Sequence, residues 1–332
     1  MAEILECSYV IIGAFIGAGF ISGKEIYLYF FRFGIGGIFN LFFVTMYLGY
    51  VLNKTIIIAQ KNNLDNYDLF IDFLIKNKKI KYIFKIIINL FLLFSFELMM
   101  TGMCGFINDL TGIGKIKIFV VCYFLFIIIF RQKIEIILKI NKFLIPIIGI
   151  FLICIFFKYV HINTSHIESN YYFFPSFLYA NFNLLCLIPF AVLMAKRIKS
   201  VKKTNYICVI SSFSIFLLSV IVFLLLGQGN EFVWVKDFPI AEIIKKNNIF
   251  LGKFYDFIIM SAILTTAISQ GYSYVEKYKN NKKMYKNKLI LMLGVGIIFM
   301  QYSFSNVMEF VYPIFGCLGF ILCGYIILKR MD

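Results

Sequence analysis

The stretch that decides the fold is residues 9–33, YVIIGAFIGAGFISGKEIYLYFFRF. It is apolar enough to lie in a bilayer, yet it contains four glycines and then a charged pair: Gly13, Gly17, Gly19, Gly23, Lys24 and Glu25. Glycine weakens a helix by about 1 kcal/mol relative to alanine, so this density predicts a helix that opens. Opening frees backbone N–H and C=O groups, which hydrocarbon cannot solvate. We therefore predict a broken helix whose free backbone groups hold a ligand near the middle of the membrane.

The composition of the whole chain is typical of a membrane protein. Of its 332 residues, 61% are hydrophobic and 19% aromatic, and only 15% are charged. Soluble domains of this size contain more charge, and the runs of about 20 apolar residues that cross a bilayer recur here. We predict an all-α polytopic protein that forms a single membrane domain over residues 1–332. The motifs GxSxG, HExxH and GxxxxGK[ST] do not occur in the sequence, and we expect no enzyme and no cofactor.

Ten apolar segments are expected to cross the membrane, roughly 4–31, 33–53, 83–107, 116–131, 140–158, 175–195, 205–227, 251–275, 288–305 and 307–328. Lys and Arg test this count, because they concentrate in cytoplasmic loops. In this chain 24 of the 33 fall in the connections after the even-numbered segments and in the C-terminal tail. Both termini are therefore predicted to face the cytoplasm. The net charge of +16 is then an orientation signal beside the lipid bilayer, and we expect no nucleic-acid partner.

Two polar connections contain apolar residues at helical spacing. Residues 60–81 are predicted to form a short interfacial helix on the cytoplasmic side. The outer connection, residues 228–252, contains Trp234 and Pro239 and predicts another short helix. This second helix is either a cap that acts as an outer gate or an ordinary interfacial helix.

Ten segments divide into two halves of five, about 4–158 and about 175–328. An odd number of crossings per half makes the second half enter from the opposite side, as in transporters built from inverted repeats. The first segment of the second half contains Asn181, Asn183 and Pro189 within its apolar run. Asn favours caps and turns, and Pro removes a backbone donor. We therefore predict that the first and sixth membrane helices are both broken.

The predicted break in the first helix lies about 16 Å along its length at 1.5 Å per residue, close to mid-membrane. The outer half would begin near Phe20 with its positive dipole end at the break, which attracts an anion such as a carboxylate. The predicted substrate-binding residues around the two broken helices are Gly17, Ala18, Gly19, Phe20, Asn181 and Asn183. The alternative is that the glycines only allow close helix packing.

A cation site is predicted on the inner side of the same break. The inner half-helix would end near Gly13 to Ile16, where free carbonyls can coordinate a small cation. In the eighth segment, Ala262, Thr265 and Thr266 share one helix face near mid-depth, and adjacent hydroxyls there suit Na⁺. The alternative is that these hydroxyls bond back to their own helix. No metal site other than this one is expected.

Three of the charged residues within the apolar segments are candidates for a functional role. Glu97 is predicted to bind a substrate ammonium group or to act as a proton site, because an acidic residue at that depth is costly. A structural partnership with a buried Lys or Asn is the alternative. Lys24 and Glu25 are gate candidates, for example as an ion pair at an outer gate.

The run GAFIGAGFISGKEI, followed by FFRFG, resembles the opening of the YkvI-like group of bacterial membrane proteins. This group is distantly similar to branched-chain amino acid–cation symporters of the amino acid–polyamine–organocation superfamily. The resemblance implies the LeuT-type fold, ten helices in two inverted repeats of five. It also implies a Na⁺ site at the matching positions Gly13, Ile16, Ala262, Thr265 and Thr266. Gly17 and Gly19 match the unwound turn that receives a substrate carboxylate, whereas Lys24 stands where the group usually has Gln.

Two functions agree with this sequence. The first is a secondary active transporter of an amino acid or similar small solute in the bacterial cytoplasmic (inner) membrane, coupled to Na⁺ or H⁺. Its site would lie between helices 1, 3, 6 and 8, with alternating access around it. The second is a non-transporting sensor or receptor subunit, similar to relatives of this superfamily in spore germination. The sequence leaves the solute, the coupling ion and the oligomeric state open.

Overall fold

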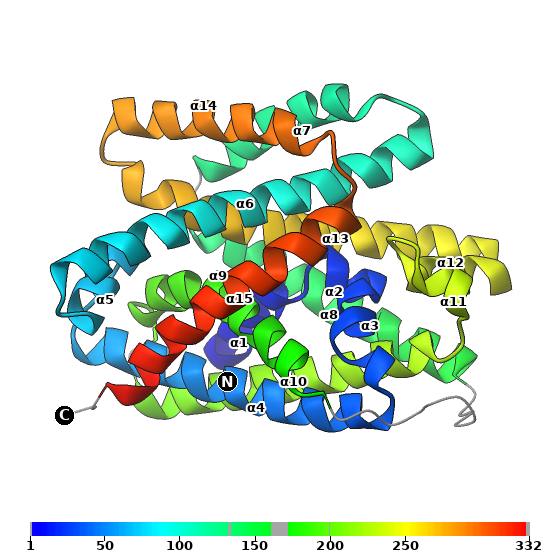
Figure 1. The fold of residues 1–332 in the computed structure, drawn as a ribbon, viewed down its shortest axis with the longest axis horizontal. Helices are drawn as coiled ribbons and strands as arrows, with labels where there is room; N and C mark the ends of the chain where they lie inside the picture. The colour runs from blue at the N-terminus through cyan, green and yellow to red at the C-terminus, as the bar shows by residue number, and fades with distance from the viewer. Residues whose placement is uncertain (1, 132–133, 161–171, 199, 330–332) are drawn as a thin grey trace.

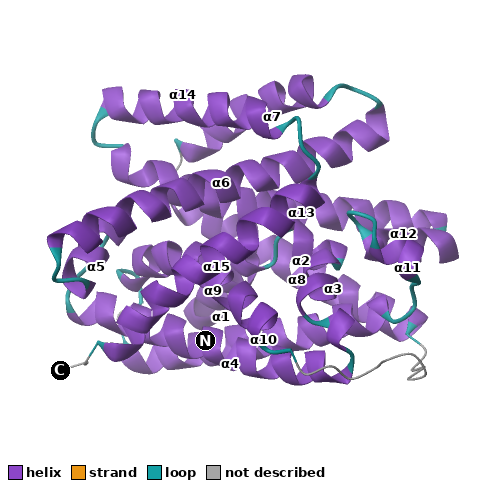
Figure 2. Cartoon of the chain, viewed as in Figure 1, coloured by secondary structure: helices purple, strands orange, loops and turns teal. Residues whose placement is uncertain are grey.

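The computed structural model describes residues 2–131, 134–160, 172–198 and 200–329. Within these ranges every regular element is a helix, as Figure 2 shows, so the predicted all-α class is confirmed. In chain order the elements are α1 (Ala2–Phe15), α2 (Ala18–Ser22), α3 (Lys24–Tyr29), η1 (Phe31–Phe33), α4 (Ile35–Lys61), α5 (Tyr67–Leu74), α6 (Lys78–Thr111), α7 (Lys115–Phe130), α8 (Ile134–Tyr159), α9 (Phe174–Ala195), α10 (Val201–Leu226), α11 (Glu231–Trp234), α12 (Pro239–Asn247), α13 (Ile249–Val275), η2 (Glu276–Tyr278), α14 (Lys282–Phe299) and α15 (Phe304–Leu328).

Among the described residues, six helices are long and apolar enough to cross a membrane: α4, α6, α9, α10, α13 with η2, and α15. Residues Phe143–Tyr159 of α8 form a shorter apolar helix. A multi-pass membrane protein is therefore confirmed, while the count of ten crossings stays a prediction.

The helices run mostly along the long axis of the molecule (Figure 1). The short helix α5 and the C-terminal end of α15 lie at one end of that axis, and α11 and α12 lie at the other. The charge pattern predicts that α5 and the C-terminus are cytoplasmic and that the segment with α11 and α12 is external, and this orientation stays a prediction.

The first membrane segment is broken in two places. α1 ends at Phe15, Ile16 and Gly17 are not helical, and α2 begins at Ala18, so the predicted break is confirmed. A second bend occurs at Gly23, whose φ of +84° is in the left-handed region that favours glycine. Helix α3 therefore leaves this bend in a new direction.

The prediction of a broken sixth helix is wrong. Helix α9 runs without interruption from Phe174 to Ala195, with Pro189 inside it. The amide nitrogens of Asn181 and Asn183 donate to the carbonyls of Phe177 and Tyr179, 2.8 and 2.9 Å away, one turn back on the same helix. Both Asn side chains are satisfied within the helix, so neither opens it as a cap. Of the six membrane-length helices, α9 is the most buried.

The short helices predicted in the polar connections are present. α5 buries Phe70, Ile71 and Leu74, as expected for an amphipathic helix on the end of the bundle. In the connection of residues 228–252, α11 and α12 form a cap over α3. The cap contains Trp234, whose ring stacks on Tyr27 at 5.7 Å between centroids.

Candidate functional site

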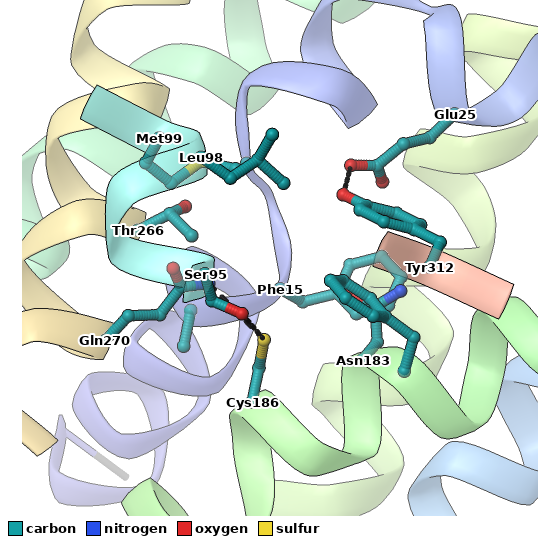
Figure 3. Close-up of a pocket in the computed structure, with 13 residues that line it drawn as sticks. Phe15, Glu25, Ser95, Leu98, Met99, Asn183, Cys186, Thr266, Gln270 and Tyr312 are labelled. Carbon is teal, nitrogen blue, oxygen red and sulfur yellow. Dashed lines mark hydrogen bonds between the residues drawn. The ribbon is translucent and has the colours of Figure 1, made fainter. Parts of the chain in front are cut away.

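A small cavity lies beside the first break of helix 1, between the broken helix and α6, α9, α13 and α15 (Figure 3). It is lined by Ala14, Phe15, Gly17, Glu25, Ser95, Leu98, Met99, Phe182, Asn183, Cys186, Thr266, Gln270 and Tyr312. The space open to the centre of a water molecule is about 10 Å³, which is room for about one water. A solute of amino-acid size therefore enters only if lining side chains or helices move.

Four of the five predicted cation ligands, all except Thr265, meet at the edge of this cavity. The hydroxyl oxygen of Thr266 lies 2.9 Å from the carbonyl oxygen of Ile16 and 3.3 Å from that of Gly13. It also lies 3.1 Å from the carbonyl oxygen of Ala262, on its own helix. Three carbonyls from two helices thus converge on one hydroxyl. A cluster composed only of oxygen atoms, at the negative end of α1, has the chemistry that a hard cation such as Na⁺ prefers.

Thr265 has a different environment from Thr266. Its hydroxyl donates to the carbonyl of Ala262 at 2.9 Å, and its own carbonyl accepts from Ser269. These are the back-bonds that the sequence left as the alternative. The Thr265 hydroxyl contacts the cluster through the Ala262 carbonyl. The two adjacent threonines therefore have different environments.

Glu25 points into the cavity. Its side chain is buried, and its two oxygens accept hydrogen bonds from the hydroxyls of Tyr179 (2.7 Å) and Tyr312 (2.5 Å). Gly19 makes room for it, because a Cβ at Gly19 would stand 2.3 Å from Oε1 of Glu25. The second bend, at Gly23, brings this carboxylate back over the first break. Glu25 therefore connects the broken helix to α9 and α15.

Lys24 has other partners, so the expected Lys24–Glu25 ion pair is absent from the described contacts. The Lys24 ammonium donates to the carbonyls of Trp234 (3.2 Å) and Val235 (2.9 Å) in the cap. The two gate candidates thus contact different parts of the protein: Lys24 contacts the cap of α11 and α12, and Glu25 lines the cavity.

The other predicted substrate residues of helix 1 and α9 have different positions relative to the cavity. Gly17 and Asn183 line the cavity. Gly19 and Phe20 are buried beside it, Phe20 in an edge-to-face contact with Phe15 at 5.6 Å. Ala18 begins α2, which has five residues and so offers little of the anion-attracting dipole that the sequence predicted.

Asn181 and Glu97 lie outside the cavity. The side-chain oxygen of Asn181 accepts from the hydroxyl of Tyr47 on α4. Glu97 lies on α6 but faces α14, where its Oε2 is 2.5 Å from the position of a Cβ at Gly296. Both Glu97 oxygens are fully buried without a hydrogen-bond partner among the described residues. The buried Lys or Asn partner that the sequence offered as an alternative is not seen among them.

Sequence reasoning missed several lining residues, notably Ser95, Cys186, Gln270 and Tyr312. The position of Gln270 could have been predicted from the sequence, because it lies one helical turn after Thr266 on the same face of α13. Its side-chain nitrogen donates to the sulfur of Cys186 at 3.3 Å, and its oxygen is buried without a partner in the described chain. Ser95, Cys186 and Tyr312 are ordinary residues of apolar helices, and nothing in the sequence marks them.

No protein-family model matches the chain. It is 22% identical to "Uncharacterized membrane protein YkvI" of Bacillus subtilis (strain 168) over 338 aligned positions, covering 98% of this chain and 95% of that protein. It is also 25% identical to "Uncharacterized protein YyaD" of the same organism over 333 positions, covering 94% of this chain and 93% of that protein. The resemblance to YkvI-like membrane proteins is thus confirmed.

Among solved structures, the chain is similar to an inward-facing conformation of Mhp1, a LeuT-fold transporter, with a TM-score of 0.59 and 12% identity. The match covers 98% of this chain and 75% of the Mhp1 chain. At this identity the likeness shows the fold alone. The protein therefore has the LeuT-type fold that the sequence predicted, with helix 1 broken and helix 6 continuous.

Proposed function

We propose that the protein is a secondary active transporter that moves a small amino-acid-like solute across the bacterial cytoplasmic membrane, driven by Na⁺. The observation that carries this proposal is the convergence of the Gly13, Ile16 and Ala262 carbonyls on the Thr266 hydroxyl. Helix interiors do not offer free carbonyls, and a break supplies them only where a ligand or another group satisfies them. Na⁺ would bind to these oxygens, displacing the hydrogen bonds of the Thr266 hydroxyl.

Coupling between ion and solute follows from the position of Thr266. It belongs to the oxygen cluster and also lines the cavity. Its methyl carbon lies 3.6 Å from the position of a Cβ at Gly17, at the break itself. An ion that fixes Thr266 and the end of α1 would therefore order one wall of the solute site, which raises the affinity for the solute.

The small cavity agrees with alternating access. A site with room for about one water is a closed state, and transport requires that helices part to admit the solute on one side at a time. In the proposed orientation, both termini are cytoplasmic and the cap of α11 and α12 covers the outer entrance.

The test is Na⁺-driven uptake by the purified protein in proteoliposomes, with a panel of labelled amino acids. We compare Thr266→Val, which removes the hydroxyl, with Thr55→Val as a matched control. Thr55 is also fully buried, but its hydroxyl bonds only to the Val51 carbonyl of its own helix. Hydrogen bonds to a charged partner contribute about 1.5–3 kcal/mol, so we expect the Na⁺ needed for half-maximal uptake to rise about tenfold or more in Thr266→Val.

Uptake that needs an inward Na⁺ gradient in wild type and in Thr55→Val, and that needs about tenfold more Na⁺ in Thr266→Val, would support the proposal. Uptake that is equal in Na⁺ and in choline would contradict Na⁺ coupling. Binding of an amino acid without any transport would favour the sensor function instead.

A further inference from the structure

The cavity contains one charged group among its described lining residues, the carboxylate of Glu25. The side chain is 3% exposed. Its described partners are two neutral hydroxyls, one on each oxygen, and the neighbouring Lys24 is bound to backbone carbonyls of the cap instead. A carboxylate that accepts from two O–H donors has the hydrogen-bond pattern of the ionised form, which can only accept. A buried charge without a counter-ion is costly, and a cation bound beside this carboxylate would offset that cost.

A second acceptor lies elsewhere along the cavity wall. The side-chain oxygen of Gln270 is buried and has no hydrogen-bond partner in the described part of the chain. The amide nitrogen of the same side chain is held by the sulfur of Cys186, which orients the group. Buried polar atoms are nearly always hydrogen-bonded, so an unused acceptor in a cavity wall indicates that a ligand supplies the donor.

Between these two acceptors the wall is neutral. Leu98, Met99 and Phe182 supply apolar surface, and Ser95 and Asn183 supply uncharged polar groups. In Figure 3, Glu25 and Gln270 lie on opposite sides of the space. The wall therefore has negative charge and a spare acceptor, but no fixed positive charge to match a carboxylate.

We propose that the solute carries a positively charged nitrogen and that Glu25 is the residue that binds it. The chemical class is a primary ammonium compound, an amine or a zwitterionic amino acid, with an apolar part of modest size. This inference rests on the proposed transport function and adds the solute class and the residue that selects it. The ammonium group replaces tyrosine hydroxyls on the carboxylate, and a donor of the solute reaches Gln270.

Of the two tyrosines bound to Glu25, Tyr312 is the one that can move away from the carboxylate. It lies on α15 directly before Pro313, which is inside the helix and removes one of the backbone hydrogen bonds that would hold that turn. Its ring stacks on Phe182 at 3.7 Å between centroids and covers the cavity wall. A bend of α15 at Pro313 would withdraw this ring, open the cavity and release one oxygen of Glu25 for the ammonium group.

The experiment measures thermal unfolding of the purified full chain in Na⁺ buffer with matched probe sets. Each set contains an amino acid, the amine without its carboxylate, and the acid without its amine. The sets are alanine, ethylamine and propanoate; valine, isobutylamine and 3-methylbutanoate; and leucine, 3-methylbutan-1-amine and 4-methylpentanoate. A ligand that binds the folded state raises its stability by mass action, so titrations give apparent affinities.

The variants are Glu25→Gln, which keeps the shape and removes the charge, and Glu309→Gln as the control. Glu309 is exposed on α15, three residues before Tyr312, and does not line the cavity. We expect amines and amino acids of at least one set to stabilise wild type and Glu309→Gln, and the acids to have no effect. In Glu25→Gln the apparent affinity for the ammonium probes should fall about tenfold or more, because a charge-assisted hydrogen bond is lost.

If Glu25→Gln does not fold, Glu25→Asp keeps the charge and should retain preference for amines over acids at lower affinity. Acids that bind as well as amines, or ammonium binding unchanged in Glu25→Gln, would overturn the inference. If Na⁺ stabilises the protein but none of the ammonium probes does, the inference about Glu25 is overturned and the transport proposal is unaffected. Loss of the Na⁺ effect itself would point to failure of the proposed function.

Discussion

The carboxylate of Glu25 lies directly over Gly19: a Cβ added to Gly19 would stand 2.3 Å from Oε1 and 2.6 Å from Cγ of Glu25. The glycine-rich motif therefore does more than open a helix. One glycine bends the chain so that the carboxylate returns over the break, and another leaves the space that the carboxylate occupies.

Gly19→Ala is expected to displace Glu25 and to lower the free energy of unfolding by about 1–3 kcal/mol, the usual cost of overpacking. The matched control is Gly17→Ala, where an added Cβ meets Met99 and Thr266 at ordinary distances of 3.5 and 3.6 Å. Thermal unfolding of both variants measures the difference. In the double variant, Glu25→Ser shortens the side chain and should offset the loss of stability caused by Gly19→Ala. If it does not, contact between position 19 and Glu25 is not the cause of that loss.

Lys24 should hold the cap of α11 and α12 closed. Its ammonium binds the carbonyls of Trp234 and Val235, and Trp234 is the only tryptophan in the chain, so its fluorescence reports on the cap. In Lys24→Ala we expect a red-shifted emission and stronger quenching by acrylamide. Lys236→Ala, an exposed lysine beside the cap, should leave both unchanged. An unaltered spectrum in Lys24→Ala would show that the stacking on Tyr27 holds the cap without the lysine.

Glu97 is expected to be neutral and to take no part in transport. Its two oxygens are fully buried without described partners, and a charge there would be severely destabilising. Glu97→Gln should leave Na⁺-driven uptake within about twofold of wild type. Glu97→Met, which removes both unpaired oxygens, should raise the free energy of unfolding by about 1 kcal/mol or more. Loss of uptake in Glu97→Gln, with normal folding, would instead make Glu97 a working proton site.

The helix α5 is held to α6 by ion pairs between Asp72 and two lysines, Lys81 at 3.3 Å and Lys85 at 2.8 Å. Partial burial raises the pKa of Asp72, but the hydrogen bonds and charges of Lys85 and Lys81 outweigh it and hold the pKa below its usual range. The stabilisation is therefore present above the unfolded pKa of about 3.9 and lost as the pH falls through the folded value.

These pairs are partly exposed, so their contribution is at most about 1 kcal/mol. Hydrogen exchange of α5 amides should be faster in Asp72→Asn than in wild type at neutral pH. Protection that is equal in the two proteins would mean that the buried face of α5, and not the ion pairs, holds the helix.

Much of the site followed from local spacing. The glycines between Gly13 and Gly19 predicted the break, and the run Ala262, Thr265, Thr266 predicted which helix faces it. Both predictions succeed because one helix turn decides which side chains are neighbours. The spacing did not separate Thr265 from Thr266, since adjacent positions differ by about 100° and the helix rotation depends on tertiary packing.

The incorrect predictions also concern features that depend on tertiary packing. On α6, the apolar run around Glu97 has no polar side, so the sequence does not reveal that Ser95 faces the cavity and Glu97 faces α14. The asparagines of α9 suggested a break, but their amides bond within the helix. The inward position of Glu25 depends on the left-handed bend at Gly23, a backbone choice that glycine permits and does not dictate.

The most direct test of the central claim is equilibrium binding of radioactive Na⁺ to the purified protein, in wild type, Thr266→Val and Thr55→Val. The structure predicts saturable binding in wild type and in Thr55→Val, competed by unlabelled Na⁺ but not by K⁺ or choline, and an affinity about tenfold or more lower in Thr266→Val. Binding that persists unchanged in Thr266→Val, or no saturable binding in wild type, would contradict the assignment of the oxygen cluster at the helix break as a sodium site.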